Sequence, residues 1–151
     1  MTALIGQQLD ALLFEETNET ANLSNAAALL MQSMDKVSWA GFYLYQAAQD
    51  ELILGPFQGK VACMHIKNGT GVCGTAFNTG KVQRVANVHE FPGHIACDSE
   101  SNAEIVVPLI KDGHKIGVLD LDSTNYDRFS HQDELDLQEF AAVLVKHLDV
   151  A

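Results

Sequence analysis

Residues 104–122 read EIVVPLIKDGHKIGVLDLD and contain the clearest structural signal in the chain. Two aliphatic runs, rich in β-branched residues, flank the pair Asp112-Gly113. An Asp-Gly pair between such runs is a strong short-range signal for a tight hairpin turn. The segment therefore predicts two antiparallel strands, at 104–110 and 115–122.

Further strand-like runs precede this hairpin. Three of them follow one another, separated by the polar turns AAQD and QGK, which is typical of an antiparallel meander. A fourth run comes after a glycine-rich stretch, residues 68–80. The expected strands are WAGFYLYQ (39–46), ELILGPF (51–57), VACMHI (61–66) and VQRVANV (82–88).

Helices are expected at both ends of the chain, where apolar residues recur at helical spacing. Ser130, with Asp133 three positions later, is typical of the N-cap of a closing helix. The glycine-rich stretch leads into a further short helix. The apolar positions of the three longer helices are Ile5, Leu9, Leu12 and Leu13; Leu23, Ala26, Ala27, Leu30 and Met34; and Leu137, Phe140, Ala141, Leu144 and Leu148.

Helices that bracket about six strands predict an α+β fold. We expect a central antiparallel sheet with helices packed on one face and a ligand pocket under loops on the other face. A chain of 151 residues has the size of one compact domain, so a single domain over residues 1–151 is expected.

Composition limits the classes of partner. Twenty acidic and nine basic residues give a formal net charge of −11, which repels nucleic-acid phosphates and anionic lipid surfaces. The first residues lack the basic region of a secretory signal, and no apolar run approaches the roughly 20 residues that cross a bilayer. We therefore expect a cytoplasmic protein that binds neither nucleic acid nor membranes.

Three cysteines, Cys63, Cys73 and Cys97, are candidates for chemistry. Their odd number, in a reducing compartment, argues against a structural disulfide framework. Cys73 is expected in the glycine-rich loop and Cys97 in a long irregular connection, residues 87–102, and such loops often carry function. Three interpretations remain open, namely inert buried thiols, a metal site completed by a histidine, and redox catalysis by an attacking and a resolving thiol.

Carboxylates and aromatic rings are expected on one face of the sheet. Asp120 and Asp122 are two residues apart on a strand, so both point to the same face and could hold a cationic amino group or supply a proton. Trp39 and Tyr43 also share a face and could form a wall for a sulfur-containing or cationic ligand. The alternatives are solvated acids, aromatic core packing and, for Glu104, a simple surface charge.

Six segments are more distinctive together than any single residue. They are SWAGFYLY, LILGPFQGKVAC, GTGVCGTAF, VHEFPGHIACDSES, EIVVPLI and GVLDLDS. This set resembles the free methionine-(R)-sulfoxide reductases, single-domain enzymes of the GAF fold, and the similarity runs from about Glu16 to the last helix. The resemblance implies reduction of free methionine-(R)-sulfoxide to methionine, with thioredoxin as the reductant, no metal or organic cofactor, and a homodimer.

The resemblance also implies roles for single residues. Cys97 corresponds to the attacking cysteine that becomes a sulfenic acid, Cys63 to the resolving cysteine, and Cys73 to a third cysteine. Glu104, assisted by Asp122, is expected to protonate the leaving oxygen. The implied substrate-binding groups are Trp39 and Tyr43 for the methyl group, Glu104, Asp120 and Asp122 as the acids of the pocket, and the backbone amides of Ile95, Ala96 and Cys97 for the carboxylate.

Two other functions stay open at the level of the sequence. A non-catalytic GAF module that senses a small molecule would act through attached output domains and would not need the three cysteines. A zinc-binding domain could use the cysteines together with a histidine such as His65 or His94.

Overall fold

A computed structural model describes residues 4–94, 97 and 99–149 of the chain. The described residues form six strands and four α-helices. The strands are β1 (Trp39–Gln46), β2 (Glu51–Gln58), β3 (His65–Lys67), β4 (Gln83–Val85), β5 (Ala103–Lys111) and β6 (His114–Ser123), and the helices are α1 (Ile5–Leu12), α2 (Glu19–Ser33), α3 (Gly71–Thr79) and α4 (His131–Lys146).

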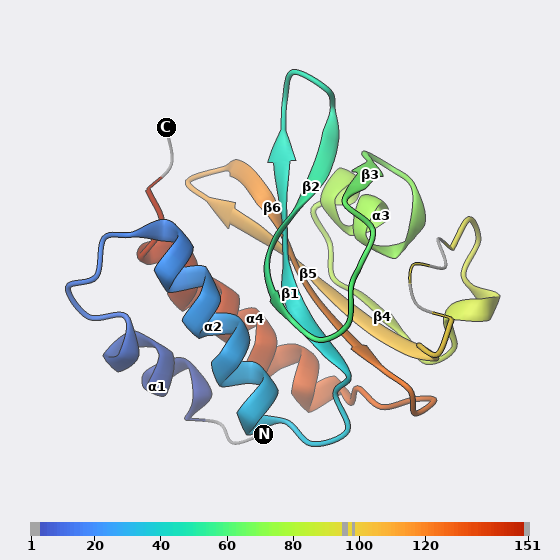
Figure 1. The fold of residues 1–151 in the computed structure, drawn as a ribbon, viewed down its shortest axis with the longest axis horizontal. Coiled ribbons are helices and arrows are strands. Elements are labelled where there is room, and N and C mark those ends of the chain that lie inside the picture. The colour runs from blue at the N-terminus through green and yellow to red at the C-terminus, as the bar shows by residue number, and fades with distance from the viewer. Residues whose placement is uncertain (1–3, 95–96, 98, 150–151) are drawn as a thin grey trace.

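The strands form one antiparallel sheet in the order β3-β2-β1-β6-β5-β4 (Figure 1). The predicted hairpin is confirmed, because β5 and β6 are joined by a turn in which Asp112 and Gly113 have φ angles of 51° and 78°. Both angles lie in the left-handed region that the favoured two-residue hairpin turn requires. Strand β6 also pairs with β1, so the hairpin fixes the middle of the sheet.

Helices α2 and α4 cover one face of the sheet, and α1 packs on these two helices (Figure 1). Their apolar residues pack against strand side chains such as Phe42, Leu119 and Leu121, which are fully buried. The predicted N-cap of α4 is confirmed: the Ser130 hydroxyl accepts from the Asp133 amide, and the Asp133 carboxylate accepts from the Ser130 amide. Leu12 departs from the prediction, since it is 47% exposed and Leu13 takes the buried position.

The opposite face carries α3, so helices lie on both sides of the sheet rather than on one. Val72, Cys73 and Phe77 of α3 pack there in one apolar cluster with Tyr43. The glycine-rich stretch was expected as a loop ahead of this helix, but the helix itself begins at Gly71. Close packing explains why Gly74 is there, because a Cβ atom would lie 2.7 Å from the carbonyl oxygen of Lys67.

Two predicted strands are shorter than expected. Of the third run only His65 and Ile66 pair with β2, in a strand that extends one residue further to Lys67, and residues 61–63, including Cys63, lie in an irregular segment before β3. The fourth run pairs only at Gln83–Val85, and a 3₁₀ turn, Val88–Glu90, follows. Ala62 of the first segment packs in the apolar cluster on the α3 side, and Val61 and Ala62 line the cavity described below.

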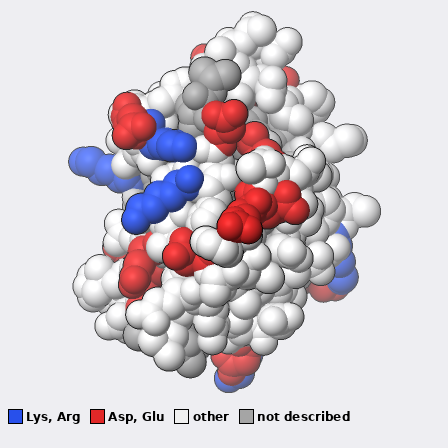
Figure 2. Space-filling view, turned by 90° about the vertical axis from the view of Figure 1, so that its left-hand side faces the viewer, with Lys and Arg blue, Asp and Glu red and all other residues white. Residues whose placement is uncertain are grey.

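One face of the described surface shows how the charged side chains are distributed. On the face shown in Figure 2, acidic side chains lie beside the basic ones, so no broad basic surface forms there. Within the described residues, no helix is both long enough and apolar enough to span a membrane.

The close approach of β1 and β6 yields a stability prediction. A Cβ atom at Gly117 would clash with the backbone carbonyl oxygen of Tyr43, which a central strand cannot move easily. We expect Gly117→Ala to lower the free energy of unfolding by about 3 kcal/mol. Urea denaturation measures this change.

Gly6→Ala is the matched control, because a Cβ at this position in α1 would only reach ordinary contact with Glu139 at 3.5 Å. Alanine in a helix is favoured over glycine, so this variant should gain about 0.5 kcal/mol. Equal urea midpoints for the two variants would contradict the packing assigned to Gly117.

Candidate active site

A cavity of about 60 Å³ lies on the α3 side of the sheet. Its lining combines an aromatic wall, thiols and acids from separate parts of the chain. The residues of this lining that the sequence singled out are Trp39, Tyr43, Cys73, His94, Cys97, Glu104, Asp120 and Asp122. The structure therefore brings these predicted candidates together.

Strand register aligns the acids and the aromatic wall. Trp39 of β1 pairs with Asp122 of β6, and Asp122 pairs with Glu104 of β5, so the three residues form one row across three strands. Residues directly opposite one another in a sheet point to the same face. Asp120 lies two positions from Asp122 on that same face, while Leu119 and Leu121 face the helices, as predicted.

Glu104 and Asp120 are buried rather than solvated, and Asp122 is half-buried. Glu104 is 7% exposed and Asp120 is 5% exposed, so the interpretation of Glu104 as a surface charge is wrong. Burial and the charge of Asp120 raise the pKa of Glu104 well above its usual range. Burial and the charge of Asp122 likewise raise the pKa of Asp120. These carboxyl groups therefore tend to hold protons at pH values where ordinary acids are ionised.

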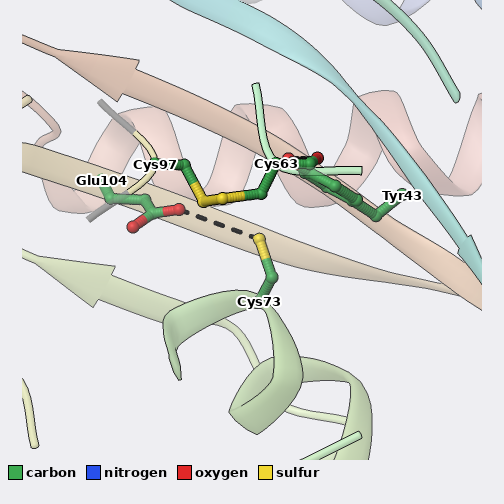
Figure 3. Close-up of a disulfide and its surroundings, with 5 residues drawn as sticks. All are labelled: Tyr43, Cys63, Cys73, Cys97 and Glu104. Carbon is green, nitrogen blue, oxygen red and sulfur yellow. Dashed lines mark hydrogen bonds between the residues drawn. A yellow bond between two sulfur atoms is a disulfide. The ribbon is translucent and has the colours of Figure 1, made fainter. Parts of the chain in front are cut away.

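Two of the three cysteines form a disulfide. Cys63 and Cys97 are bonded through their sulfur atoms with a Cα–Cα distance of 5.4 Å, although they are 34 residues apart in the sequence. Figure 3 shows the disulfide beside the Glu104 carboxyl, with the sulfur of Cys73 below it. The zinc set of three cysteines and a histidine is not assembled in this arrangement, because Cys63 and Cys97 are bonded to each other.

The free thiol is Cys73, which is buried in the first turn of α3. The expected loop position of Cys73 is therefore wrong, since Gly71 and Gly74 are accommodated within the helix. Its Sγ atom donates to Glu104 Oε2 at 3.8 Å (Figure 3). Burial, followed by the charges of Asp120 and Glu104, raises the pKa of the Cys73 thiol, which favours the protonated form.

The aromatic wall also holds the segment that carries Cys63. The Trp39 and Tyr43 rings stack with centroids 5.9 Å apart. Trp39 Nε1 donates to the carbonyl oxygen of Lys60 at 3.1 Å, and the Tyr43 hydroxyl donates to the carbonyl oxygen of Cys63 at 2.9 Å. Burial, followed by the charge of Asp120, raises the pKa of Tyr43, so this hydroxyl remains a donor.

Comparison with known proteins identifies the family. The sequence profile described as "GAF domain" matches residues 8–148. The chain belongs to the GAF domain family. The resemblance drawn from the sequence segments is thus confirmed at the level of the family, and the GAF-like α+β fold agrees with the sheet described above.

Several proteins similar to this chain are named free methionine-R-sulfoxide reductase. The free methionine-R-sulfoxide reductase of Escherichia coli (strain K12) is 49% identical over 144 residues, which are 95% of this chain and 86% of that protein. The structure of the free methionine-R-sulfoxide reductase from Neisseria meningitidis in complex with its substrate has a TM-score of 0.91 and 45% identity, covering 95% of this chain and 85% of that one. The reduced form of fRMsr of Staphylococcus aureus has a TM-score of 0.92 and 49% identity, covering 97% and 94%.

Two residues that pack against the aromatic wall were not predicted from the sequence, and two predicted site residues lie outside the described part of the chain. Gly41 lies against the Trp39 ring, where a Cβ atom would come within 2.9 Å of Cη2, and Phe57 stacks on the same ring at 5.1 Å. A glycine inside a strand is a sequence signal for such close approach. Ile95 and Ala96, expected as backbone donors, lie outside the described residues.

The raised pKa of Asp120 gives a pH-dependent prediction. The pKa of Asp120 is higher in the folded protein than its ordinary value of 3.8. Protonation of this group therefore stabilises the fold fully at pH values below 3.8, and the stabilisation is lost as pH rises through the folded-state pKa. Asp120→Asn removes the titration. We therefore expect the variant to melt at a higher temperature than the parent protein at pH 8, and the difference to narrow toward pH 4.

Asp149→Asn serves as the control for this melting experiment, because Asp149 is exposed. It should not change the dependence of melting temperature on pH. If Asp120→Asn behaves like this control across the same range, the Asp120 carboxyl does not carry the burial cost assigned to it.

Proposed function

We propose that this protein reduces free methionine-R-sulfoxide to methionine by a thiol relay. The observation that carries the proposal is the Cys63–Cys97 disulfide beside the buried Glu104 carboxyl at a cavity walled by Trp39 and Tyr43. The similar proteins of that name support the choice of substrate. A GAF module that only senses a ligand would need neither the paired thiols nor the buried acids.

Substrate binding follows from the chemistry of the cavity. The ammonium group of a free amino acid is attracted to Asp120 and Asp122, whose carboxyls face the cavity. The methyl and sulfur groups suit the aromatic wall of Trp39 and Tyr43 through polarizable contacts. Because the ammonium group must enter the cavity, a methionine residue within a polypeptide would not fit the acids in the same way. The backbone amides of residues 95–97 remain our proposal for the carboxylate.

In the first chemical step, the Cys97 thiolate attacks the sulfoxide sulfur. This attack forms a bond between the Cys97 sulfur and the substrate sulfur, and the sulfoxide oxygen takes up a proton. The new sulfur–sulfur bond then breaks as the protonated oxygen moves from the substrate sulfur to the Cys97 sulfur, which releases methionine and leaves Cys97 as a sulfenic acid. The sulfoxide sulfur is reduced by two electrons and the Cys97 sulfur is oxidised by two. Glu104 is the proposed proton donor, assisted by Asp122, since its raised pKa keeps a proton available near neutral pH.

In the second step, the Cys63 thiol attacks the sulfenic acid of Cys97. A sulfur–sulfur bond forms and one water molecule leaves, which produces the disulfide seen here. An external dithiol then reopens the bond by thiol–disulfide exchange and restores both thiols. We propose thioredoxin as this dithiol, a cytoplasmic location, and a homodimer. The relay requires no metal or organic cofactor.

The test of the attacking residue uses separated epimers of methionine sulfoxide, with dithiothreitol as the reductant. The parent protein should consume only the R epimer. Cys97→Ser should lose activity by a factor of at least about 10⁴, as removal of a nucleophile generally does. Methionine release by chromatography measures both results, and full activity of Cys97→Ser would show that Cys97 is not the nucleophile.

The resolving role has its own test. Cys63→Ser, prepared in the reduced state, should still release one equivalent of methionine, because attack by Cys97 does not need the second thiol. It should fail in repeated turnover with thioredoxin. Cys73→Ser is the comparison variant, and normal thioredoxin-driven turnover of Cys63→Ser together with failure of Cys73→Ser would assign resolution to Cys73 instead.

A further inference from the structure

Cys73, Glu104 and Asp120 form a compact group of donors that we call the Cys73 cluster. One sulfur atom and two carboxylate oxygens, one from each residue, all lie within 4.8 Å of one another. All three residues are buried. The relay proposed above uses Cys63 and Cys97, so the thiol of Cys73 takes no part in the described disulfide and stays free in the oxidised protein.

An independent observation at Asp120 supports a ligand site at this cluster. Asp120 is 5% exposed, and its Oδ1 atom is buried with no hydrogen-bond partner among the described residues. A buried carboxylate oxygen without a partner is costly, and buried charges in proteins are normally paired or bound to a metal. Asp120 is one of the residues that line the cavity on the α3 side of the sheet.

The donor types select the kind of cation. A thiolate with two carboxylates is a set that suits Zn²⁺, which binds sulfur at about 2.3 Å and oxygen at about 2.1 Å. Hard cations such as Mg²⁺ and Ca²⁺ prefer oxygen donors alone. Donors of a tetrahedral zinc ion lie about 3.5 Å apart. The Cys73 Sγ to Glu104 Oε2 distance is 3.8 Å, which is close to this separation, and the three donor atoms all lie within 4.8 Å of one another, so the side chains must draw together to coordinate the ion.

We propose that the Cys73 cluster binds one thiophilic divalent cation, Zn²⁺ in particular, which then excludes the ammonium group of the substrate. Binding displaces the thiol proton of Cys73 and any proton held by the two carboxyls, and a water molecule completes the coordination. The exclusion rests on the proposed function, because it assumes that the substrate uses the same acids. The cation would act as an inhibitor, since the relay itself uses none.

The test uses the oxidised protein, in which Cys73 is the free thiol, with Cd²⁺ as a probe whose bond to a thiolate absorbs in the ultraviolet. We expect one equivalent of Cd²⁺ to produce this absorption and Zn²⁺ to displace it. A large excess of Mg²⁺ should leave it unchanged. Absence of the absorption, or its loss on addition of Mg²⁺, would overturn the proposal.

Variants separate coordination from general attraction of charge. Cys73→Ser should abolish the sulfur absorption, and Asp120→Asn should weaken cation binding about tenfold or more. Asp122→Asn is the matched control, because it removes the same charge from the same face of β6 without removing one of the three donors. Equal weakening by the two aspartate variants would contradict coordination by Asp120.

Free methionine provides the competition test. Increasing methionine should displace Cd²⁺ from the oxidised protein, and failure to do so would refute the exclusion of substrate. These binding measurements need no turnover. A protein that binds Cd²⁺ as described but does not reduce methionine-R-sulfoxide would contradict the proposed function and leave the cation site standing.

Discussion

The register of β1, β6 and β5 is the constraint on which the site depends. It sets Trp39, Asp122 and Glu104 in one row, with Asp120 on the same face. A slip of one residue would turn every side chain of β6 to the other face and would place its acids against the helices. The turn at Asp112-Gly113 fixes the pairing of β5 with β6. The position of the acids in the cavity therefore depends on a turn that lies outside the cavity.

Burial of polar groups at the cavity shifts their pKa values toward reactive forms, and it also lowers the free energy of unfolding. Burial raises the pKa of Glu104, of Asp120 and of the Cys73 thiol, and the charge of Asp120 further raises the pKa of Glu104 and of Cys73, which favours protonated forms. A protonated carboxyl beside a thiol is what the departure of a sulfoxide oxygen needs. The surrounding fold must offset the cost, and the fully buried apolar layer under α1, α2 and α4 does so. The buried polar groups of the site thus lower the stability of the fold while serving the proposed function, a trade-off that is common at active sites.

Local patterns in the sequence predicted the parts of this protein whose physics is local. The hairpin at Asp112-Gly113, the capping box of α4 and the shared face of Asp120 and Asp122 all depend on neighbours within a few residues. The helical position of Cys73 was missed because glycines usually indicate a loop, and only packing against β3 explains Gly74. The Cys63–Cys97 pairing entered through the family resemblance alone, since tertiary structure brings together residues 34 positions apart.

In the proposed relay, the disulfide is a product of the reaction with substrate. This proposal is tested most directly by mixing fully reduced protein with one equivalent of methionine-R-sulfoxide, without any reductant, and mapping the quenched protein by mass spectrometry. We expect one molecule of methionine to be released for each pair of peptides that becomes linked through Cys63 and Cys97. Methionine formed with both of these cysteines still reduced, or with the S epimer as effective as the R epimer, would contradict it.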